Sequence, residues 1–140
     1  MSPLKKAGIF LFVRRGVLFE ILHPYDIIIK RKEGMVPFSE FKKLEIKIAT
    51  IKEVSNHPNA DKLYVIKIDV GGIEKTIVAG IKSGYAPEQL INRCIVVVDN
   101  LEPAVIRGVE SQAMLLAASD DKGISILIPD REVKTGSLVK

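Results

Sequence analysis

The amino-acid sequence predicts an all-β fold built as a closed antiparallel barrel. In the main part of the chain, three strand-like segments come first, a one-turn helix follows, and two or three further strands complete the series. This is the element order of the five-stranded oligonucleotide/oligosaccharide-binding (OB) barrel, whose ligand face is flanked by the loops after strands one and four. Those two loops are also the most chemically distinctive segments of this chain, so we expect a binding module.

The first half of the barrel is predicted from alternation and turns. Phe38 to Leu44 is predicted as a short helix with apolar residues three apart. Glu45 to Val54 follows as strand one, and its apolar phase changes at Ala49, which predicts a bulge. Strands two and three form a hairpin, Leu63 to Val70 and Lys75 to Ile81, closed by Gly71-Gly72.

The second half is predicted from one proline and several apolar runs. Pro87 starts a short helix between strands three and four, where its missing N–H costs nothing. The fifth strand, Ala113 to Ala118, is apolar throughout, so we expect it to be buried on both faces. The other segments are strand four (Arg93 to Asp99), an additional C-terminal hairpin strand (Ile124 to Ile128) and a turn-rich tail from Pro129 along the surface.

Two regions are expected, an N-terminal extension (1–37) and the barrel domain (38–140). Residues 1–34 hold seven basic and three acidic side chains, which leaves 14 of each sign in the rest of the chain. Three readings of the extension stay open: an extra strand or helix packed on the domain, a flexible basic arm, or upstream sequence from a misplaced start, with Met35 as the alternative. No apolar run approaches the roughly 20 residues of a membrane span.

Composition limits the classes of function. The chain is 47% apolar and 27% charged, as in a soluble globular protein. A neutral barrel has no bulk basic signature, so it would bind a polyanion through a local cluster of cations. Cys94 is the one cysteine and lies in an apolar run, where we expect a buried, inert thiol. It has no disulfide partner within the chain, which favours a reducing compartment such as the cytoplasm.

The two distinctive loops carry candidate cations. Arg107 precedes Gly108, which lets the backbone approach a ligand closely. Lys62 ends the first loop and Lys82 follows strand three, and with Arg107 they are our candidates for phosphate contacts. The alternative is that all three are ordinary solvated side chains.

Ser111 and Met114 follow at the junction with strand five. A hydroxyl suits a phosphate or a ribose 2′-hydroxyl, and a thioether suits a base or sugar. The alternatives are that Ser111 caps the local backbone and that Met114 fills the core.

Three motifs carry a family resemblance. They are His57-Pro-Asn-Ala-Asp-Lys-Leu63, Ile77-Val-Ala-Gly-Ile81, and Asn100-Leu-x-Pro followed by Arg107-Gly-Val-x-Ser-x-x-Met-Leu-Leu-Ala-Ala118. From about Phe38 to the end, the chain resembles the EMAP-II-type tRNA-binding domain. That domain occurs as a stand-alone dimeric tRNA-binding protein and as the C-terminal domain of many methionyl-tRNA synthetases.

The resemblance implies an OB barrel that binds tRNA by shape, largely without reading sequence. The family's Ser-x-Gly-Met element contributes to tRNA binding and matches Ser111 and Met114, and Asn100 joins the expected tRNA contacts through its own motif. The family's glycine between them is Ala113 here; alanine hinders binding if that position needs a positive φ or close approach, and is neutral otherwise. Ala49 replaces a second family glycine. The resemblance also implies a homodimer.

Catalysis has little support in the sequence. His23 and His57 have no partner cysteine or acidic cluster at metal-ligand spacing, and His57 precedes a proline in a turn, so we expect it to face solvent. Asn59 and Asp61 are expected to form turns through nearby backbone N–H groups. Neither a phosphate-cradling glycine loop nor a nucleophile elbow occurs. The sequence predicts no catalytic residue, no metal and no cofactor.

The predicted function is therefore tRNA binding by a non-catalytic, cytoplasmic homodimer. It would serve as an auxiliary protein or β subunit of an aminoacyl-tRNA synthetase, most directly the methionyl enzyme, by raising the local concentration of tRNA. The scarcity of aromatic side chains favours recognition of folded RNA through its backbone. Two alternatives stay open: a secretion-related peptide-binding chaperone on the same dimeric fold, and an adaptor that docks onto a synthetase through its N-terminal arm.

Overall fold

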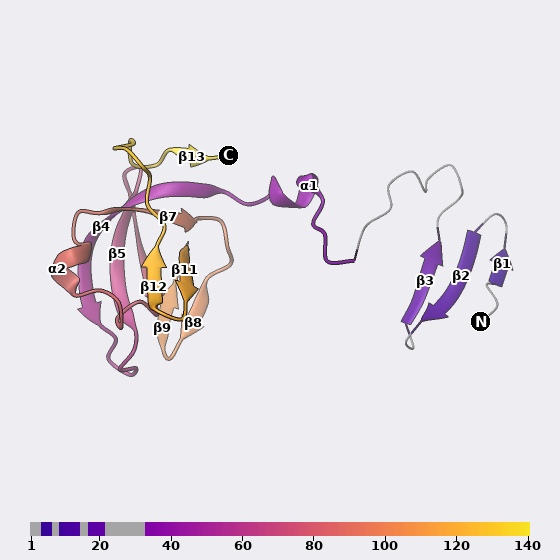
Figure 1. The fold of residues 1–140 in the computed structure, drawn as a ribbon, viewed down its shortest axis with the longest axis horizontal. Helices are drawn as coiled ribbons and strands as arrows, with labels where there is room; N and C mark the ends of the chain where they lie inside the picture. Colours follow the sequence, from indigo (N-terminus) through magenta and orange to yellow (C-terminus); the bar gives the residue numbers. More distant parts are fainter. Residues whose placement is uncertain (1–3, 7–8, 15–16, 22–32) are drawn as a thin grey trace. The chain divides into compact units, whose positions relative to one another are not determined.

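The computed structural model describes residues 4–6, 9–14, 17–21 and 33–140, and side chains from residue 33 onward. The chain divides into two compact units, residues 1–38 and 39–140. In the first unit, β1 (Leu4–Lys6), β2 (Ile9–Arg14) and β3 (Val17–Ile21) form an antiparallel sheet in the order β1-β2-β3 (Figure 1). Which reading of the extension holds stays a prediction, and His23 lies outside the described residues.

The second unit is an all-β barrel, which confirms the predicted fold class. Its sheet has the order β10-β7-β4-β5-β6, and every neighbouring pair is antiparallel. These strands are β4 (Ile46–Asn56), β5 (Tyr64–Val70), β6 (Ile73–Ala79), β7 (Cys94–Val98) and β10 (Met114–Leu115). The other elements are α1 (Phe38–Phe41), α2 (Pro87–Leu90), β8 (Ala104–Ile106), β9 (Val109–Ser111), β11 (Ala117–Asp120), β12 (Gly123–Ile126) and β13 (Leu138–Val139).

Alternation places the core inside the curled sheet. β5 buries Tyr64, Ile66, Ile68 and Val70 on one face, as predicted, because successive side chains of a strand point to opposite faces. The inward residues of the neighbouring strands complete one cluster, which includes Ala49, Ile51, Ile77, Ala79, Leu90, Ile95, Val97 and Ala113. The loop between β4 and β5 and the segment after β7 therefore both begin at strands that pack in this one core.

Side chains close the barrel between β6 and the segment after β9. The Gln112 backbone N–H donates to the Thr76 carbonyl (2.8 Å), and the Gln112 side-chain Oε1 accepts from the Thr76 N–H (2.8 Å). One step along, the Val78 N–H donates to Ser111 Oγ (3.0 Å). Two polar side chains thus take the place of ladder bonds at this seam.

The predicted bulge in the first barrel strand is present. The pairing of β4 with β5 shifts register between Ile51 and Glu53, slightly beyond the predicted position at Ala49. The change of phase at Ala49 has another cause: Ala49 faces the core, while Ile48 is buried on the outer face under the C-terminal tail. The Ile48 N–H donates to the Ser137 carbonyl (2.9 Å), and β13 pairs with β4.

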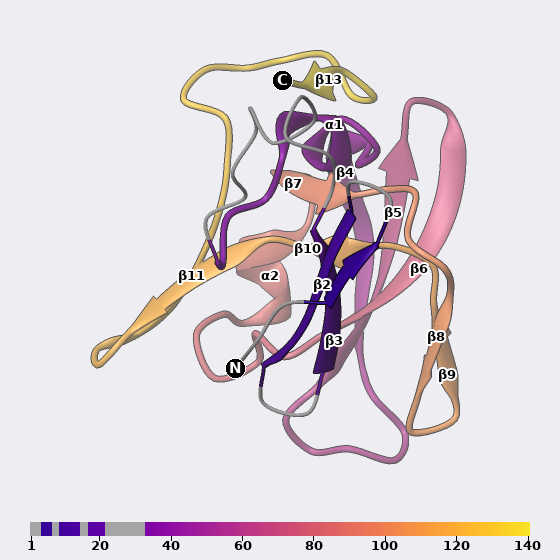
Figure 2. The ribbon, with the colours of Figure 1, turned by 90° about the vertical axis from the view of Figure 1, so that its right-hand side faces the viewer.

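The prediction that the fifth strand is buried on both faces is wrong. Met114 is 48% exposed, and β10 ends at Leu115, where one more hydrogen bond follows from the Leu116 N–H to the Val96 carbonyl (3.0 Å). Ala117 to Asp120 is exposed and pairs with β12 in a hairpin that projects from the barrel (Figure 2). An apolar run of alanines therefore marks an exposed ribbon here. Two smaller differences are that α1 ends at Phe41 and that Cys94 is only half-buried.

Candidate nucleic-acid interface

The segment after β7 is a hairpin rather than the expected loop. β8 and β9 pair in register from Ala104 with Ser111 to Ile106 with Val109. At the tip, Arg107 has a φ of 49° and Gly108 a φ of 88°. Positive φ at both central residues is the geometry of a type I′ turn, which matches the twist of paired strands. Gly108 suits this turn, but arginine at the first position is unusual in that conformation, so the sequence did not predict a hairpin here.

This hairpin tip is hydrogen-bonded to the loop between β4 and β5 at one end of the barrel (Figure 1). His57 Nε2 donates to the Ile106 carbonyl (2.9 Å), and Asn59 Nδ2 donates to the Arg107 carbonyl (3.1 Å). The Asn59 backbone N–H donates to His57 Nδ1 (2.9 Å). The expectation that His57 faces solvent is wrong, because its side chain leaves the turn to meet the hairpin and only 5% of the residue is exposed. Asn59 likewise reaches a distant backbone carbonyl.

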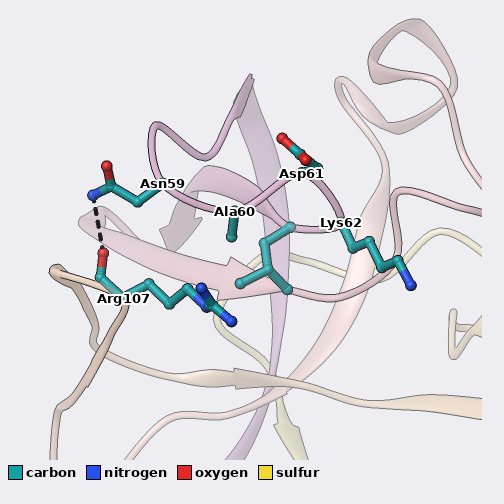
Figure 3. A pocket seen from close by; sticks show the side chains of 6 residues that line it. Asn59, Ala60, Asp61, Lys62 and Arg107 are labelled. Carbon is teal, nitrogen blue, oxygen red and sulfur yellow. Dashed lines mark hydrogen bonds between the residues drawn. The ribbon is translucent and has the colours of Figure 1, made fainter.

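Two adjoining clefts lie along this loop. The first, of about 500 Å³, is lined by Asn59, Ala60, Asp61, Lys62, Leu63 and Arg107 (Figure 3). The second, of about 420 Å³, shares Asp61, Lys62 and Leu63 and adds Gly80, Lys82 and Ser83. Lys62 therefore lies between Arg107 on one side and Lys82 on the other. In Figure 3 the Asp61 carboxylate points away from the cationic groups of Lys62 and Arg107.

Lys82, which lines the second cleft, lies over the ring of a buried tyrosine. Lys82 Nζ lies 5.8 Å from the centre of the Tyr64 ring, within the range of a cation–π contact. The buried Tyr64 hydroxyl donates to the Tyr85 carbonyl (2.7 Å), and the Tyr85 hydroxyl accepts from the Ile126 N–H (3.0 Å). The aromatic ring beneath Lys82 is therefore fixed by the core.

The other three predicted contacts lie away from these clefts or are engaged elsewhere. Asn100 Oδ1 accepts from the Glu45 N–H (2.7 Å), and its Nδ2 donates to the Lys43 carbonyl (2.6 Å). The buried Ser111 hydroxyl donates to the Ala113 carbonyl (3.0 Å) and accepts from Val78.

Met114 pairs with Val98, which in turn pairs with Ile46 at the start of β4. The clefts follow the other end of that strand. The structure thus brings Lys62, Lys82 and Arg107 together and leaves Asn100, Ser111 and Met114 outside the group.

The alanine that replaces a family glycine fits the backbone. Ala113 is not among the residues with positive φ, and its side chain is buried in the core. A β-carbon at this position therefore meets no conformational penalty, which favours the neutral of the two alternatives for this substitution.

A buried carboxylate missed by the sequence analysis pairs with two nearby lysines. Asp99 Oδ1 lies 2.7 Å from Lys75 Nζ, and Asp99 Oδ2 lies 2.9 Å from Lys47 Nζ. Burial alone would raise the pKa of Asp99, but the hydrogen bonds from Lys75 and Lys47 outweigh it and hold that pKa below its ordinary value. The hydrogen bond to Asp99 raises the pKa of Lys47. Through Asp99, which follows β7, these two ion pairs connect β4 and β6.

Other classes of site find no support in the part of the chain that the structure describes. There, no group of three or more histidine, cysteine or acidic side chains is arranged to hold a metal ion. Its helices are also too short to cross a membrane.

Comparison with known families assigns the barrel. The family described as "Putative tRNA binding domain" matches residues 46–138. This chain belongs to that family. The motif-based assignment is thereby confirmed, and the match covers β4, β5, β6, β7 and β10 of the barrel sheet.

Relatives of this tRNA-binding domain are found within methionine–tRNA ligases. The ligase of Pyrococcus furiosus is 54% identical over 111 residues, which is 79% of this chain and 15% of the ligase. The ligase of Leptospira biflexa is 40% identical over 111 residues, 78% of this chain and 16% of the ligase. The chain therefore spans only about 15% of the length of these relatives.

Solved structures show the same fold. A protein from Pyrococcus horikoshii described as related to MetRS has a TM-score of 0.70 and 33% identity, covering 76% of this chain and 98% of its own. The CsaA chaperone protein of Picrophilus torridus has a TM-score of 0.71 and 33% identity, covering 76% and 100%. The chain is a tRNA-binding domain related to part of the methionine–tRNA ligases.

Proposed function

We propose that the two clefts bind the sugar–phosphate backbone of folded tRNA. The observation that carries this proposal is the convergence of Lys62, Lys82 and Arg107 on adjoining clefts from three different segments. Phosphate contacts of this kind fix position and orientation without reading sequence. Because residues 35–140 carry equal numbers of acidic and basic side chains, this local cluster supplies the attraction.

The lining of the two clefts favours recognition of RNA by its folded shape rather than by its base sequence. None of the residues that line the two clefts is aromatic, and Tyr64 beneath Lys82 is buried. Binders of single strands stack bases on exposed aromatic rings. A surface with cations and no stacking platform suits a folded RNA whose bases are already paired.

The domain would act as an auxiliary tRNA-binding protein or subunit for a methionyl-tRNA synthetase. Its relatives are parts of such ligases, and a tethered second site raises the effective concentration of tRNA at the enzyme. In this proposal the chain supplies binding and its partner supplies the chemistry. The cytoplasmic location predicted from the single cysteine stays a prediction.

A homodimer is the proposed assembly. Exposed apolar side chains cluster where the chain leaves the barrel: Met114 is 48% exposed, Leu127 43% and Ile128 49%, and the Leu127 N–H donates to the Leu116 carbonyl. Covering this surface with a second copy would bury it. Sedimentation equilibrium should give a dimer for the parent and a monomer for Ile128→Glu; a parent that stays monomeric would contradict this assembly.

The second candidate is a peptide-binding chaperone. Two observations favour it, the likeness to the CsaA chaperone protein and the same exposed apolar side chains. This function predicts affinity for unfolded peptides that does not fall with salt, because apolar contact rather than charge would drive binding. Affinity for tRNA that depends steeply on salt would favour the first candidate instead.

A competition experiment tests the tRNA proposal. The parent, Arg107→Ala and the matched surface control Lys122→Ala are titrated with tRNA and with an unstructured RNA of equal length. We expect the parent to prefer tRNA, and Arg107→Ala to bind it roughly tenfold more weakly, as for one lost charge-assisted hydrogen bond. Equal affinity for both RNAs, or an unaffected Arg107→Ala variant, would contradict the proposal.

A further inference from the structure

His57 and Asn59 join two segments that are far apart in sequence. The first is the loop between β4 and β5, which carries Lys62, and the second is the tip of the β8–β9 hairpin, which carries Arg107. Three hydrogen bonds make this latch: His57 to the Ile106 carbonyl, Asn59 to the Arg107 carbonyl, and the Asn59 N–H to His57 Nδ1. The loop is also closed at its base, where the His57 N–H donates to the Leu63 carbonyl (3.1 Å).

The latch uses both ring nitrogens of one buried histidine in opposite senses. Because the Asn59 N–H donates to Nδ1, that nitrogen must be the acceptor, and the proton therefore lies on Nε2. Nε2–H then donates to the Ile106 carbonyl, 2.9 Å away. His57 is 5% exposed and does not line either cleft, so bound RNA would not touch it.

The hydrogen bonds of the latch hold the backbone on both sides of Arg107. Arg107 has a φ of 49°, a conformation that side chains other than glycine rarely adopt, and surrounding contacts must hold it there. The carbonyls of Ile106 and Arg107, on either side of the Arg107 α-carbon, are the two that the latch captures. The tip also lies close to the loop, since a β-carbon built on Gly108 would be 3.6 Å from Asn59 Nδ2.

We propose that His57 and Asn59 are positioning residues for RNA binding. They hold the hairpin tip so that Arg107 and Lys62 face one cleft before RNA arrives, and the ordering of the tip is then complete in the unbound protein. The inference rests on the proposed function, because it assigns the latch to the same clefts. We therefore expect the loss of the latch to weaken RNA binding only while Arg107 is present.

A double-mutant cycle separates positioning from general stability. The variants are Asn59→Ala, Arg107→Ala and the double variant, with Asn56→Ala as a matched asparagine control outside the latch. Asn59 is exposed, so its truncation leaves the core intact. We expect Asn59→Ala to weaken tRNA binding roughly fivefold, as for one lost hydrogen bond, and to do so less than twofold when Arg107 is already alanine. Asn56→Ala should match the parent in both backgrounds.

Two variants of His57 separate the two hydrogen bonds that its ring makes. His57→Gln keeps a donor for the Ile106 carbonyl, and His57→Asn keeps an acceptor for the Asn59 N–H. We expect each to retain more tRNA affinity than His57→Ala, and the nitrogen chemical shifts of His57 in the parent to show a proton on Nε2 alone.

The outcomes distinguish the inference from the proposed function. A parent that binds no tRNA would overturn the proposed function, and the positioning role with it. A parent that binds tRNA while Asn59→Ala and Arg107→Ala act additively, or while Asn59→Ala has no effect, would overturn the positioning role alone.

Discussion

At the scale of single residues, Asp99 is a buried charge that joins three strands of the barrel. It is buried at the end of β7 and receives hydrogen bonds from Lys47 on β4 and Lys75 on β6. Lys75 also donates to the Asp99 backbone carbonyl (3.1 Å). A single carboxylate therefore ties three strands together at the end of the barrel remote from the clefts, and its protonation state is coupled to folding.

The lowered pKa of Asp99 predicts loss of stability in acid. A carboxyl group whose pKa is lower in the folded state stabilises the fold above its unfolded pKa, which is ordinarily 3.8. That contribution disappears as the pH falls through the still lower folded pKa. Urea unfolding between about pH 7 and about pH 3 should show this loss in the parent, and Asp99→Asn should remove it.

Asp99→Asn should also cost roughly 1–3 kcal/mol at neutral pH, because it leaves two lysines without their carboxylate. Asp121→Asn, in the exposed turn between β11 and β12, is the control and should behave as the parent does. Parallel pH profiles for the parent and Asp99→Asn would contradict this role of Asp99.

Ser111 provides a second prediction at this scale. Its buried hydroxyl bonds both the Val78 N–H and the Ala113 carbonyl, so removing it leaves two backbone groups without their partner. We expect Ser111→Ala to lower the free energy of unfolding by about 1–2 kcal/mol while the folded protein keeps its tRNA affinity. Ser125→Ala, on the exposed side of β12, is the control. A loss of affinity without loss of stability would instead mark Ser111 as an RNA contact.

Which polar side chains lie together at one surface was only partly predictable from sequence. Lys62, Lys82 and Arg107 were selected because they lie in or beside the loops that flank the ligand face of an OB barrel, and the structure does bring them to adjoining clefts. Asn100 looked equally suitable, but its amide bonds the backbone of Glu45 and Lys43, more than fifty positions earlier in the chain. A linear pattern does not show which side chains are used by distant backbone groups.

At the scale of elements, local patterns predicted most of the strands. Alternation over 64–70 and the Gly71-Gly72 turn gave the β5–β6 hairpin correctly, because both signals depend on neighbouring residues. The β8–β9 hairpin was missed because its turn has arginine where asparagine or glycine is usual. β13 was missed because its partner, β4, lies some ninety positions earlier and only the folded tail reveals it.

The C-terminal tail gives a prediction at this scale. Gly136 has a φ of +91°, and a β-carbon there would lie 2.8 Å from the Gly71 α-carbon in the β5–β6 turn. Gly72 has a similar φ of +94° but open space around it. A substitution at Gly72 therefore measures the cost of the positive φ alone, without a steric clash. We expect Gly72→Ala to cost about 1–2 kcal/mol and Gly136→Ala roughly 1–3 kcal/mol more, since backbone must move. Equal losses in urea unfolding would show that the close approach does not matter.

At the scale of the whole molecule, charge is organised locally. The formal net charge of +4 is that of residues 1–34, and the remainder is neutral. Two lysines of the barrel, Lys47 and Lys75, are paired with Asp99, whereas Lys62, Lys82 and Arg107 line the clefts. Affinity for tRNA should therefore depend on these three cations rather than on the overall field of the protein.

In the proposed function these three side chains neutralise tRNA phosphates, and the salt dependence of binding tests this role most directly. Each phosphate contact adds about −0.7 to −0.9 to the slope of log K against log salt, so the parent should have a slope of about −2 to −3. Lys62→Ala, Lys82→Ala and Arg107→Ala should each reduce the steepness by about 1, and Lys122→Ala should leave it unchanged. A slope near zero, or one that none of the three substitutions alters, would show that these side chains do not neutralise tRNA phosphates.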